Sequence, residues 1–338
     1  MGCFFSKPFE RKETITLEEY EKLVKVHSSA IDNTARKVIR KPFTQERSGL
    51  AILTQKKDRG DSLSVLNKKV HDAKRVTLQS MPHDPKLKAL DFQVKLKDDN
   101  EELFHPLKIE EAKYVSHGFY GGYSYEILIT HEPSNIEISR KDLQCLMPRG
   151  WLNDEVINLY LELLKERERS EPNKFLKCHF FNTFFYKKLT SGLSGYDFRT
   201  VRRWTMKNKL GYTLIERDKV FVPIHKDMHW CLVVINIKDK SFQYLDSFGC
   251  MDIHALQILE RYLMEETQDK CDKEIDTTSW KKESVNDLPL QKNGWDCGMF
   301  MIKYIDFYSR GLKLSFSQDH MPYFRKRTAL EILRLRAD

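Results

Sequence analysis

The chain has 338 residues, of which 41% are hydrophobic and 31% charged, and its formal net charge is +8. This length suits one large domain with an extension, or two domains. The mild basicity suggests acidic partners or nuclear residence, but it does not by itself indicate nucleic-acid binding. No apolar run reaches the ~18 residues of a membrane span, and no secretory signal core is found, so we expect an intracellular protein.

Seven cysteines are scattered along the chain, and no two of them have the spacing of a metal site. An odd number of dispersed thiols is typical of reduced, intracellular proteins, so we expect no zinc site. The cysteines are Cys3, Cys145, Cys178, Cys231, Cys250, Cys271 and Cys297.

The N-terminal region differs in amino-acid composition from the rest. Its first residues, MGCFFS, match the pattern for myristoylation of Gly2, with Cys3 placed for palmitoylation. So loose a pattern often arises by chance, and one lipid anchors a protein only marginally. Residues 1–112 lack tryptophan and contain polar, turn-rich tracts. We therefore expect a partly flexible extension with a targeting or regulatory role, and short helices at 17–27 and 31–40.

Residues 113–338 have the stronger patterns of a folded domain. A helix is predicted over 151–168, where apolar residues recur at helical spacing and Asn153 or Asp154 can cap the first turn. Strands are predicted at 219–225, 229–237 and 241–248, and further helices at 254–267, at 297–311, ended by Gly311, and at 327–338. The helix at 297–311 is apolar nearly all round and should be buried. Together these elements predict an α+β fold whose sheet is at least partly antiparallel.

The last two strands form a predicted hairpin that brings a histidine close to an aspartate. With a polar turn at 238–240, His229 lies opposite a residue near 248–250, and Asp246 is one diagonal step away. Diagonal neighbours are ~7 Å apart at the backbone, within reach of a contact in which the carboxylate fixes the imidazole tautomer. A polar pair at the end of a sheet, without chemistry, explains the spacing as well, and the spacing alone favours that simpler interpretation.

The stretch QKNGWDCGMF places Cys297 after a turn and at the start of the buried helix. Free N–H groups at a helix start carry partial positive charge and favour a thiolate. Asp296 can cap the helix, and Gly298 leaves room for a substrate carbonyl. A nucleophilic cysteine also needs a base and oxyanion donors. His229 offers the base, while the Gln291 amide and the Cys297 backbone N–H offer the donors.

The chain resembles the ubiquitin-like-protein-specific cysteine proteases, the SUMO proteases, in an ordered set of motifs. The set is WLND (151–154), FFN with FFY (180–186), VRRW (201–204), VPIH (222–225), HW (229–230), YLDS (244–247) and QKNGWDCGMF (291–300). The C-terminal stretch MPYFRKRTALEILRLRAD resembles the plant branch. The resemblance covers about 113–338. It implies the papain-like fold shared with the adenovirus endopeptidase, with a central mixed sheet, flanking helices and the catalytic cysteine at the N-terminus of a buried helix.

The resemblance also implies a role for each matching residue. The general base falls on His229, the orienting acid on Asp246, the oxyanion glutamine on Gln291 and the nucleophile on Cys297. The tryptophans that clamp the Gly-Gly tail of the modifier fall on Trp151 and Trp230, and an acidic contact to the modifier falls on Asp154. Weaker candidates for the modifier-facing surface are Arg149, Phe181, Asn182, Arg202 and Arg203.

The implied activity is that of a SUMO-specific cysteine protease, which would mature the modifier's precursor and release the modifier from lysines of conjugated proteins. SUMO and its conjugates would be the partners of a monomer that needs no cofactor. The nucleus is the expected compartment, with the cytoplasm or, if Gly2 or Cys3 is lipidated, a membrane surface as alternatives. Three other activities remain open: proteolysis of a different ubiquitin-like modifier, SUMO binding by an inactive pseudoprotease, and acyl transfer on a related Cys–His framework.

Overall fold

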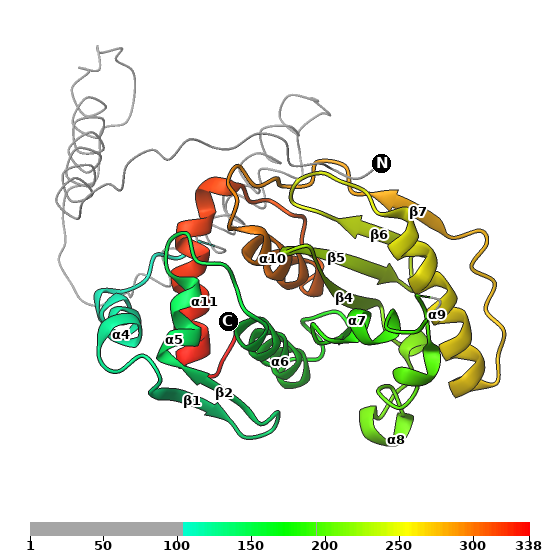
Figure 1. Cartoon of the computed structure of the whole chain (residues 1–338), viewed down its shortest axis with the longest axis horizontal. Helices are drawn as coiled ribbons and strands as arrows, with labels where there is room; N and C mark the ends of the chain where they lie inside the picture. Colours follow the sequence, from blue (N-terminus) through cyan, green and yellow to red (C-terminus); the bar gives the residue numbers. More distant parts are fainter. Residues whose placement is uncertain (1–103, 194) are drawn as a thin grey trace, which may run out of the picture. The chain divides into compact units, whose positions relative to one another are not determined.

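The computed structural model describes residues 104–193 and 195–338. The helices predicted at 17–27 and 31–40 lie outside these residues. A five-stranded mixed sheet forms the centre, in the order β3-β4-β5-β6-β7, and a separate hairpin pairs β1 with β2 (Figure 1). The strands are β1 (Ile127–His131), β2 (Ile136–Ser139), β3 (Cys178–Phe180), β4 (Lys219–Lys226), β5 (His229–Asn236), β6 (Ser241–Leu245) and β7 (Lys281–Ser284).

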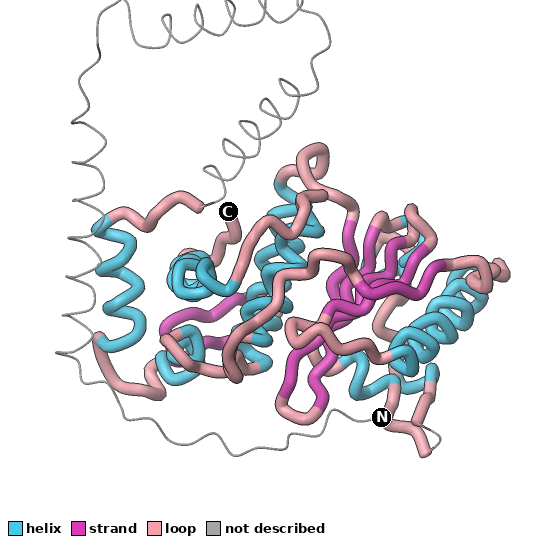
Figure 2. The backbone as a smooth tube through the Cα atoms, turned by 90° about the horizontal axis from the view of Figure 1, so that it is seen from above, coloured by secondary structure: helices cyan, strands magenta, loops and turns pink. Residues whose placement is uncertain are grey.

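Helices cover both faces of the central sheet, and Figure 2 shows the strands between α9 and the other long helices. On one face, α6, α10 and α11 share a core with Leu232 and Val234. On the other face, α7 and α9 pack against Val233 and Ile235. The helices are α4 (Ile109–Tyr120), α5 (Arg140–Leu143), α6 (Asp154–Ser170), α7 (Phe185–Leu189), α8 (Lys207–Leu210), α9 (Ile253–Cys271), α10 (Cys297–Ser309) and α11 (Met321–Leu333). Because both faces are covered, β5 is apolar at nearly every position.

The β5–β6 hairpin has the predicted register. Asn236 pairs with Ser241 and Leu232 with Leu245. Lys240 turns the chain with a φ of 50°. The strand β6 ends at Leu245, before the predicted 248, so Asp246 lies just beyond the Leu232–Leu245 pair that ends the ladder.

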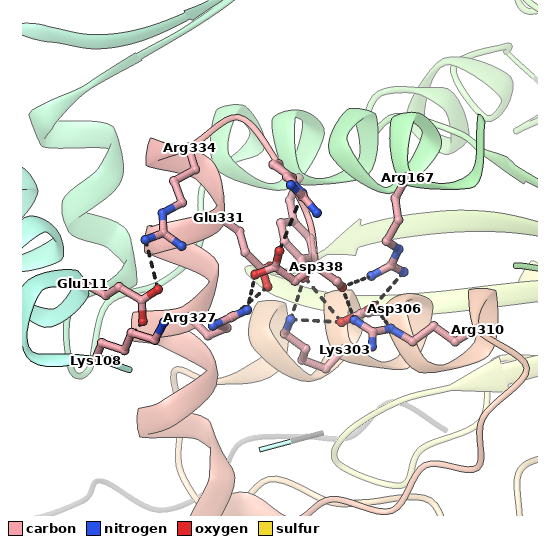
Figure 3. A network of polar contacts seen from close by, with 12 residues as sticks. Lys108, Glu111, Arg167, Lys303, Asp306, Arg310, Arg327, Glu331, Arg334 and Asp338 are labelled. Atoms are coloured by element: carbon pink, nitrogen blue, oxygen red, sulfur yellow. Dashed lines mark hydrogen bonds and ion pairs between the residues drawn. The ribbon is translucent and has the colours of Figure 1, made fainter. Parts of the chain in front are cut away.

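The C-terminal helix lies earlier in the chain than the predicted 327–338. Pro322 stands in the first turn of α11, where a missing N–H costs nothing, and the helix ends at Leu333. Residues 334–338 turn back toward α6 and α10, and Asp338 contacts Arg167, Arg310 and Arg327 (Figure 3).

A buried carboxylate lies beneath that turn. Asp306 pairs with Arg167 at 2.8 Å, with Lys303 at 3.2 Å and with Arg310 at 3.0 Å (Figure 3). Burial alone would favour the neutral acid, but these cations hold the pKa of Asp306 well below its usual range. The network joins α6, α10 and the C-terminal residues, and so fixes the helix that begins with Cys297.

The segment before α6 is also ordered. α4 begins at Ile109, ahead of the predicted domain boundary at 113, and packs against α11. Within the described ranges, no helix is both long and apolar enough to span a bilayer.

Candidate active site

Three separate elements bring the predicted catalytic residues together. His229 is the first residue of β5, Asp246 directly follows β6, and Cys297 is the first residue of α10. The His229 Nε2 atom lies 2.6 Å from Oδ1 of Asp246. The same oxygen accepts a hydrogen bond from the Phe248 N–H at 2.9 Å, and the Phe248 ring stacks on the imidazole with centroids 4.7 Å apart. The carboxylate is therefore fixed, and the ring has one orientation.

This orientation decides which nitrogen can serve the cysteine. Because Nε2 faces Asp246, Nδ1 is the nitrogen left for Cys297. Burial disfavours the charged ring, but the hydrogen bond to Asp246 and contacts with the thiols of Cys231 and Cys297 raise the pKa of His229 to about 12. The imidazole thus holds a proton at neutral pH, which suits a thiolate–imidazolium pair.

The turn before Cys297 is anchored differently from the prediction. Asp296 occupies the N-cap position of α10, but its side chain makes no capping hydrogen bond. Its buried carboxylate instead pairs with Arg325 at 2.7 Å and accepts hydrogen bonds from Asn293 and Gln318, both at 2.7 Å. The expectation of an Asp296 cap is therefore wrong, because the ion pair with Arg325 of α11 takes Oδ1 and the side-chain amides of Asn293 and Gln318 take Oδ2.

Arg325 links the cysteine turn to the segment before α6. Besides pairing with Asp296, its guanidinium donates to the carbonyl oxygens of Cys145 at 3.0 Å, Met147 at 3.1 Å and Gly150 at 2.7 Å. The Arg325 side chain therefore fixes the position of Asp296, just before Cys297, relative to Gly150, just before Trp151.

Gly298 allows close packing rather than substrate approach. A Cβ atom at this position would lie 2.8 Å from Cβ of Leu152 and 3.2 Å from Cδ1 of Trp230. The absence of a side chain lets the start of α10 press against the WLND segment. We predicted that the glycine leaves room for a substrate carbonyl, but the space that a Cβ would take is filled by Leu152 and Trp230.

Gln291 lies in the same turn, and its amide is oriented by neighbours. Its Oε1 accepts a hydrogen bond from the Ser247 hydroxyl at 2.5 Å, and its Nε2 donates to the Asn293 carbonyl at 2.6 Å. An amide nitrogen carries two N–H donors, so one remains for an oxyanion. Ser247 follows Asp246 directly, which couples the acid and the glutamine.

The two tryptophans predicted to clamp the modifier tail lie in different environments. Trp151 is 51% exposed, whereas Trp230 is 4% exposed. The Trp230 indole N–H donates to the Leu152 carbonyl at 3.1 Å, and its ring stacks on His225 with centroids 4.2 Å apart. Trp230, which follows His229, is thus bonded to Leu152, which follows Trp151. Of the two indoles, only that of Trp151 is exposed.

Two other residues predicted to face the modifier, Asp154 and Phe181, differ in their exposure. Asn153 caps α6 by accepting the Val156 N–H at 3.0 Å, which leaves the partly exposed Asp154 side chain free of the capping role. Phe181 is buried and stacks on Phe185 at 3.5 Å, so its predicted place on the modifier-facing surface is wrong.

Two residues of the site lacked a predicted role. Cys231 lies two residues after His229 on the same side of β5, and donor atoms of Cys231, His229 and Asp246 lie within 4.8 Å of one another. This group could hold a soft divalent cation. Side chains two positions apart on a strand lie on the same face of the sheet, so this rule could have predicted that Cys231 lies beside His229. Trp295 carries the Arg149 guanidinium over its ring at 5.7 Å, a contact between residues distant in sequence.

A cysteine at a helix start, a histidine beside it and an aspartate behind the histidine define a triad of the cysteine-protease type, on a mixed sheet flanked by helices. The model of the Ulp1 protease family, C-terminal catalytic domain, matches residues 150–337, and the chain belongs to this family.

Similar proteins support this assignment. The chain is 60% identical over 237 residues to the ubiquitin-like-specific protease ESD4 of Arabidopsis thaliana, covering 70% of this chain and 48% of that protein. It is 40% identical over 238 residues to human sentrin-specific protease 2, covering 70% of this chain and 38% of that protein. The chain thus spans about half the length, or less, of these relatives.

A solved structure supports the fold. The X-ray structure of the C-terminal Ulp1 protease domain in complex with Smt3, the yeast ortholog of SUMO, matches with a TM-score of 0.58 at 26% identity. The match covers 69% of this chain and 97% of that domain. The predicted fold class, with the cysteine at the start of a buried helix, is confirmed.

Proposed function

We propose that the chain is a SUMO-specific cysteine protease that cleaves after the C-terminal Gly-Gly of the modifier. The observation that carries the proposal is the 2.6 Å contact between His229 and Asp246, beside a cysteine that begins α10. The match to the Ulp1 catalytic domain supports the activity, and the Smt3 complex of the yeast domain supports SUMO as the partner.

In the proposed reaction the Cys297 thiolate attacks the carbonyl carbon of the terminal glycine. The remaining N–H of Gln291 and the Cys297 backbone N–H, which has no acceptor within its helix, stabilise the oxyanion. The His229 imidazolium gives its proton to the leaving lysine amine, and a thioester forms. A water molecule, deprotonated by His229, then hydrolyses the thioester and restores the enzyme. The same steps mature a precursor, whose tail leaves in place of the lysine.

The test is cleavage of a fluorogenic amide at the C-terminus of SUMO. The wild-type chain is expected to turn over the substrate, and Cys297→Ser is expected to lose activity, because the hydroxyl is a far weaker nucleophile beside an already protonated histidine. Undiminished cleavage by Cys297→Ser would overturn the proposal.

We further propose that the protease acts as a monomer in the nucleus, in keeping with its basic charge. Attachment to a membrane through Gly2 or Cys3 is the alternative. A fluorescent fusion, with and without Gly2→Ala, separates the two. Nuclear signal from both fusions supports the proposal, whereas a membrane signal that the substitution abolishes supports lipidation.

A further inference from the structure

Positive charge is concentrated on one segment of the described chain. Residues 185–215 contain seven lysines and arginines and a single acidic residue, while the other residues of 104–338 contain 29 basic and 32 acidic ones. The seven cations are all exposed: Lys187, Lys188, Arg199, Arg202, Arg203, Lys207 and Lys209. The protease domain is therefore close to neutral elsewhere and strongly basic here.

A groove of about 520 Å³ lies between this segment and the C-terminal end of α9. We call it the basic groove. Its lining includes Arg202, Arg203, Met206 and Lys207 from the segment and Asp269 and Lys270 from α9.

The charges of the basic groove are only partly neutralised. Asp269 is its one acidic lining residue and is shared between Arg202 at 2.6 Å and Lys270 at 2.5 Å. Lys207 has one exposed ion pair, 3.8 Å long, with Glu216. Arg203 makes no ion pair with any residue that the structure describes. Exposed pairs of this length contribute little, so the groove keeps positive charge available for a ligand.

The basic groove is remote from the catalytic residues. The Asp252 carboxylate, at the N-cap of α9, pairs with Lys226, which is the partner of His229 in the sheet. Asp269 lies about 25 Å farther along the helix axis at ~1.5 Å per residue. Figure 1 shows α9 running down toward α8 at the lower edge of the view. The cations are therefore in a poor position to bind the tail of a modifier or to assist catalysis.

We propose that the basic groove binds the phosphodiester backbone of double-stranded nucleic acid. A duplex has a far denser array of negative charge than an acidic peptide, and guanidinium groups match phosphate geometry. The lining has Met206 as its sole apolar side chain and no aromatic one. Single-stranded bases would therefore find no aromatic stacking platform in this groove. Binding through phosphates alone is independent of sequence and falls steeply with salt.

The experiment is fluorescence anisotropy of a labelled DNA duplex titrated with the full chain between 50 and 200 mM salt. The logarithm of the association constant should fall with the logarithm of the salt concentration, with a slope of roughly 0.9 per phosphate contact. The charge-reversal variant Lys207→Glu/Lys209→Glu is expected to bind at least tenfold more weakly at the lowest salt, with a slope smaller by about two. A matched variant, Lys113→Glu/Lys326→Glu, changes the net charge equally on α4 and α11 and should bind like wild type. The milder Lys207→Gln/Lys209→Gln should lie between the two if charge reversal disturbs folding.

Several results would overturn the groove proposal. These are absence of duplex binding, equal weakening by both charge-reversal variants, unchanged binding by Lys207→Glu/Lys209→Glu, and equally good competition by single-stranded DNA, an acidic peptide or anionic vesicles. Cleavage of the fluorogenic SUMO amide by Lys207→Glu/Lys209→Glu should equal wild type. If the wild-type chain and its variants bind the duplex but none of them cleaves the SUMO amide, the proposed protease activity is contradicted and the proposal for the basic groove stands.

Discussion

The Asp246 carboxylate has two tasks at the residue scale: it orients the His229 ring through Nε2 and it favours the imidazolium. Its own position is fixed by the backbone N–H of Phe248, whose ring covers the imidazole. His229 and Asp246 are 17 positions apart but belong to one hairpin with a short turn, which explains why the pair could be predicted from spacing.

Replacing Asp246 by asparagine is expected to reduce kcat/KM roughly 10²–10⁴-fold, since an amide can select the wrong imidazole tautomer and no longer favours the proton on His229. The pH at which iodoacetamide alkylates Cys297 should rise, because a less basic histidine no longer supports the thiolate. Thermal unfolding close to wild type is the control. An unchanged alkylation profile would show that Asp246 does not act through His229.

Glu266 supplies a pH-dependent term in stability. Burial raises the pKa of its carboxyl to about 7, against smaller lowering effects of Thr205 and Lys270. The folded state therefore binds a proton more tightly than the unfolded state, whose pKa is near 4.5. This contribution is fully present below pH 4.5 and is lost as pH rises toward and through 7, by at most about 3 kcal/mol.

Glu266→Gln should abolish that slope. Urea unfolding at pH 5, 6, 7 and 8 measures it, and the variant should gain stability relative to wild type as the pH increases. Parallel pH curves for the two proteins would contradict the assignment.

At the element scale, the turn before α10 depends on a residue from α11. Arg325 and Asp296 are both buried, and Arg325 also holds three carbonyl oxygens of the segment before Trp151. No local pattern in the sequence predicts this pairing, since the partners lie 29 positions apart and on different elements. An N-cap was therefore the natural but wrong expectation for Asp296.

Arg325→Leu is expected to destabilise the fold by about 3–5 kcal/mol, because it leaves a buried carboxylate without its cation. Denaturant unfolding measures the loss. Arg336→Leu, which removes a 78% exposed side chain from a 3.8 Å pair, is the matched control and should change stability by less than about 0.5 kcal/mol. Equal effects of both substitutions would remove the special role of Arg325.

Gly298→Ala should cost about 1–3 kcal/mol of stability and lower activity, because the added Cβ displaces Leu152 or the start of α10. Gly294→Ala, in the same turn, is the control, since a Cβ there meets no atom within 4 Å. Thermal unfolding and cleavage rates of the two variants give the comparison. A well-tolerated alanine at 298 would mean that the close packing is dispensable.

Across the whole molecule, what could be predicted followed from local signals. Alternating apolar residues and a polar turn determine the β5–β6 register, and an apolar run after a glycine turn marks α10. The strands β3 and β7 escaped prediction because they are short and pair in parallel with partners distant in sequence, as Cys178 does with Lys219. The environments of Trp230 and Phe181 also required the fold, because an aromatic residue in a motif looks alike whether buried or exposed.

We propose that Cys297 is the nucleophile of a protease for SUMO. The most direct test is labelling of the full chain by modifiers that carry a C-terminal electrophile, followed by mass spectrometry of the adduct. We expect the SUMO probe to modify Cys297 in the wild-type chain, a ubiquitin probe to give no adduct, and Cys297→Ala to remain unlabelled. Preference for another modifier's probe would contradict SUMO as the substrate, and SUMO labelling that persists in Cys297→Ala would contradict Cys297 as the nucleophile.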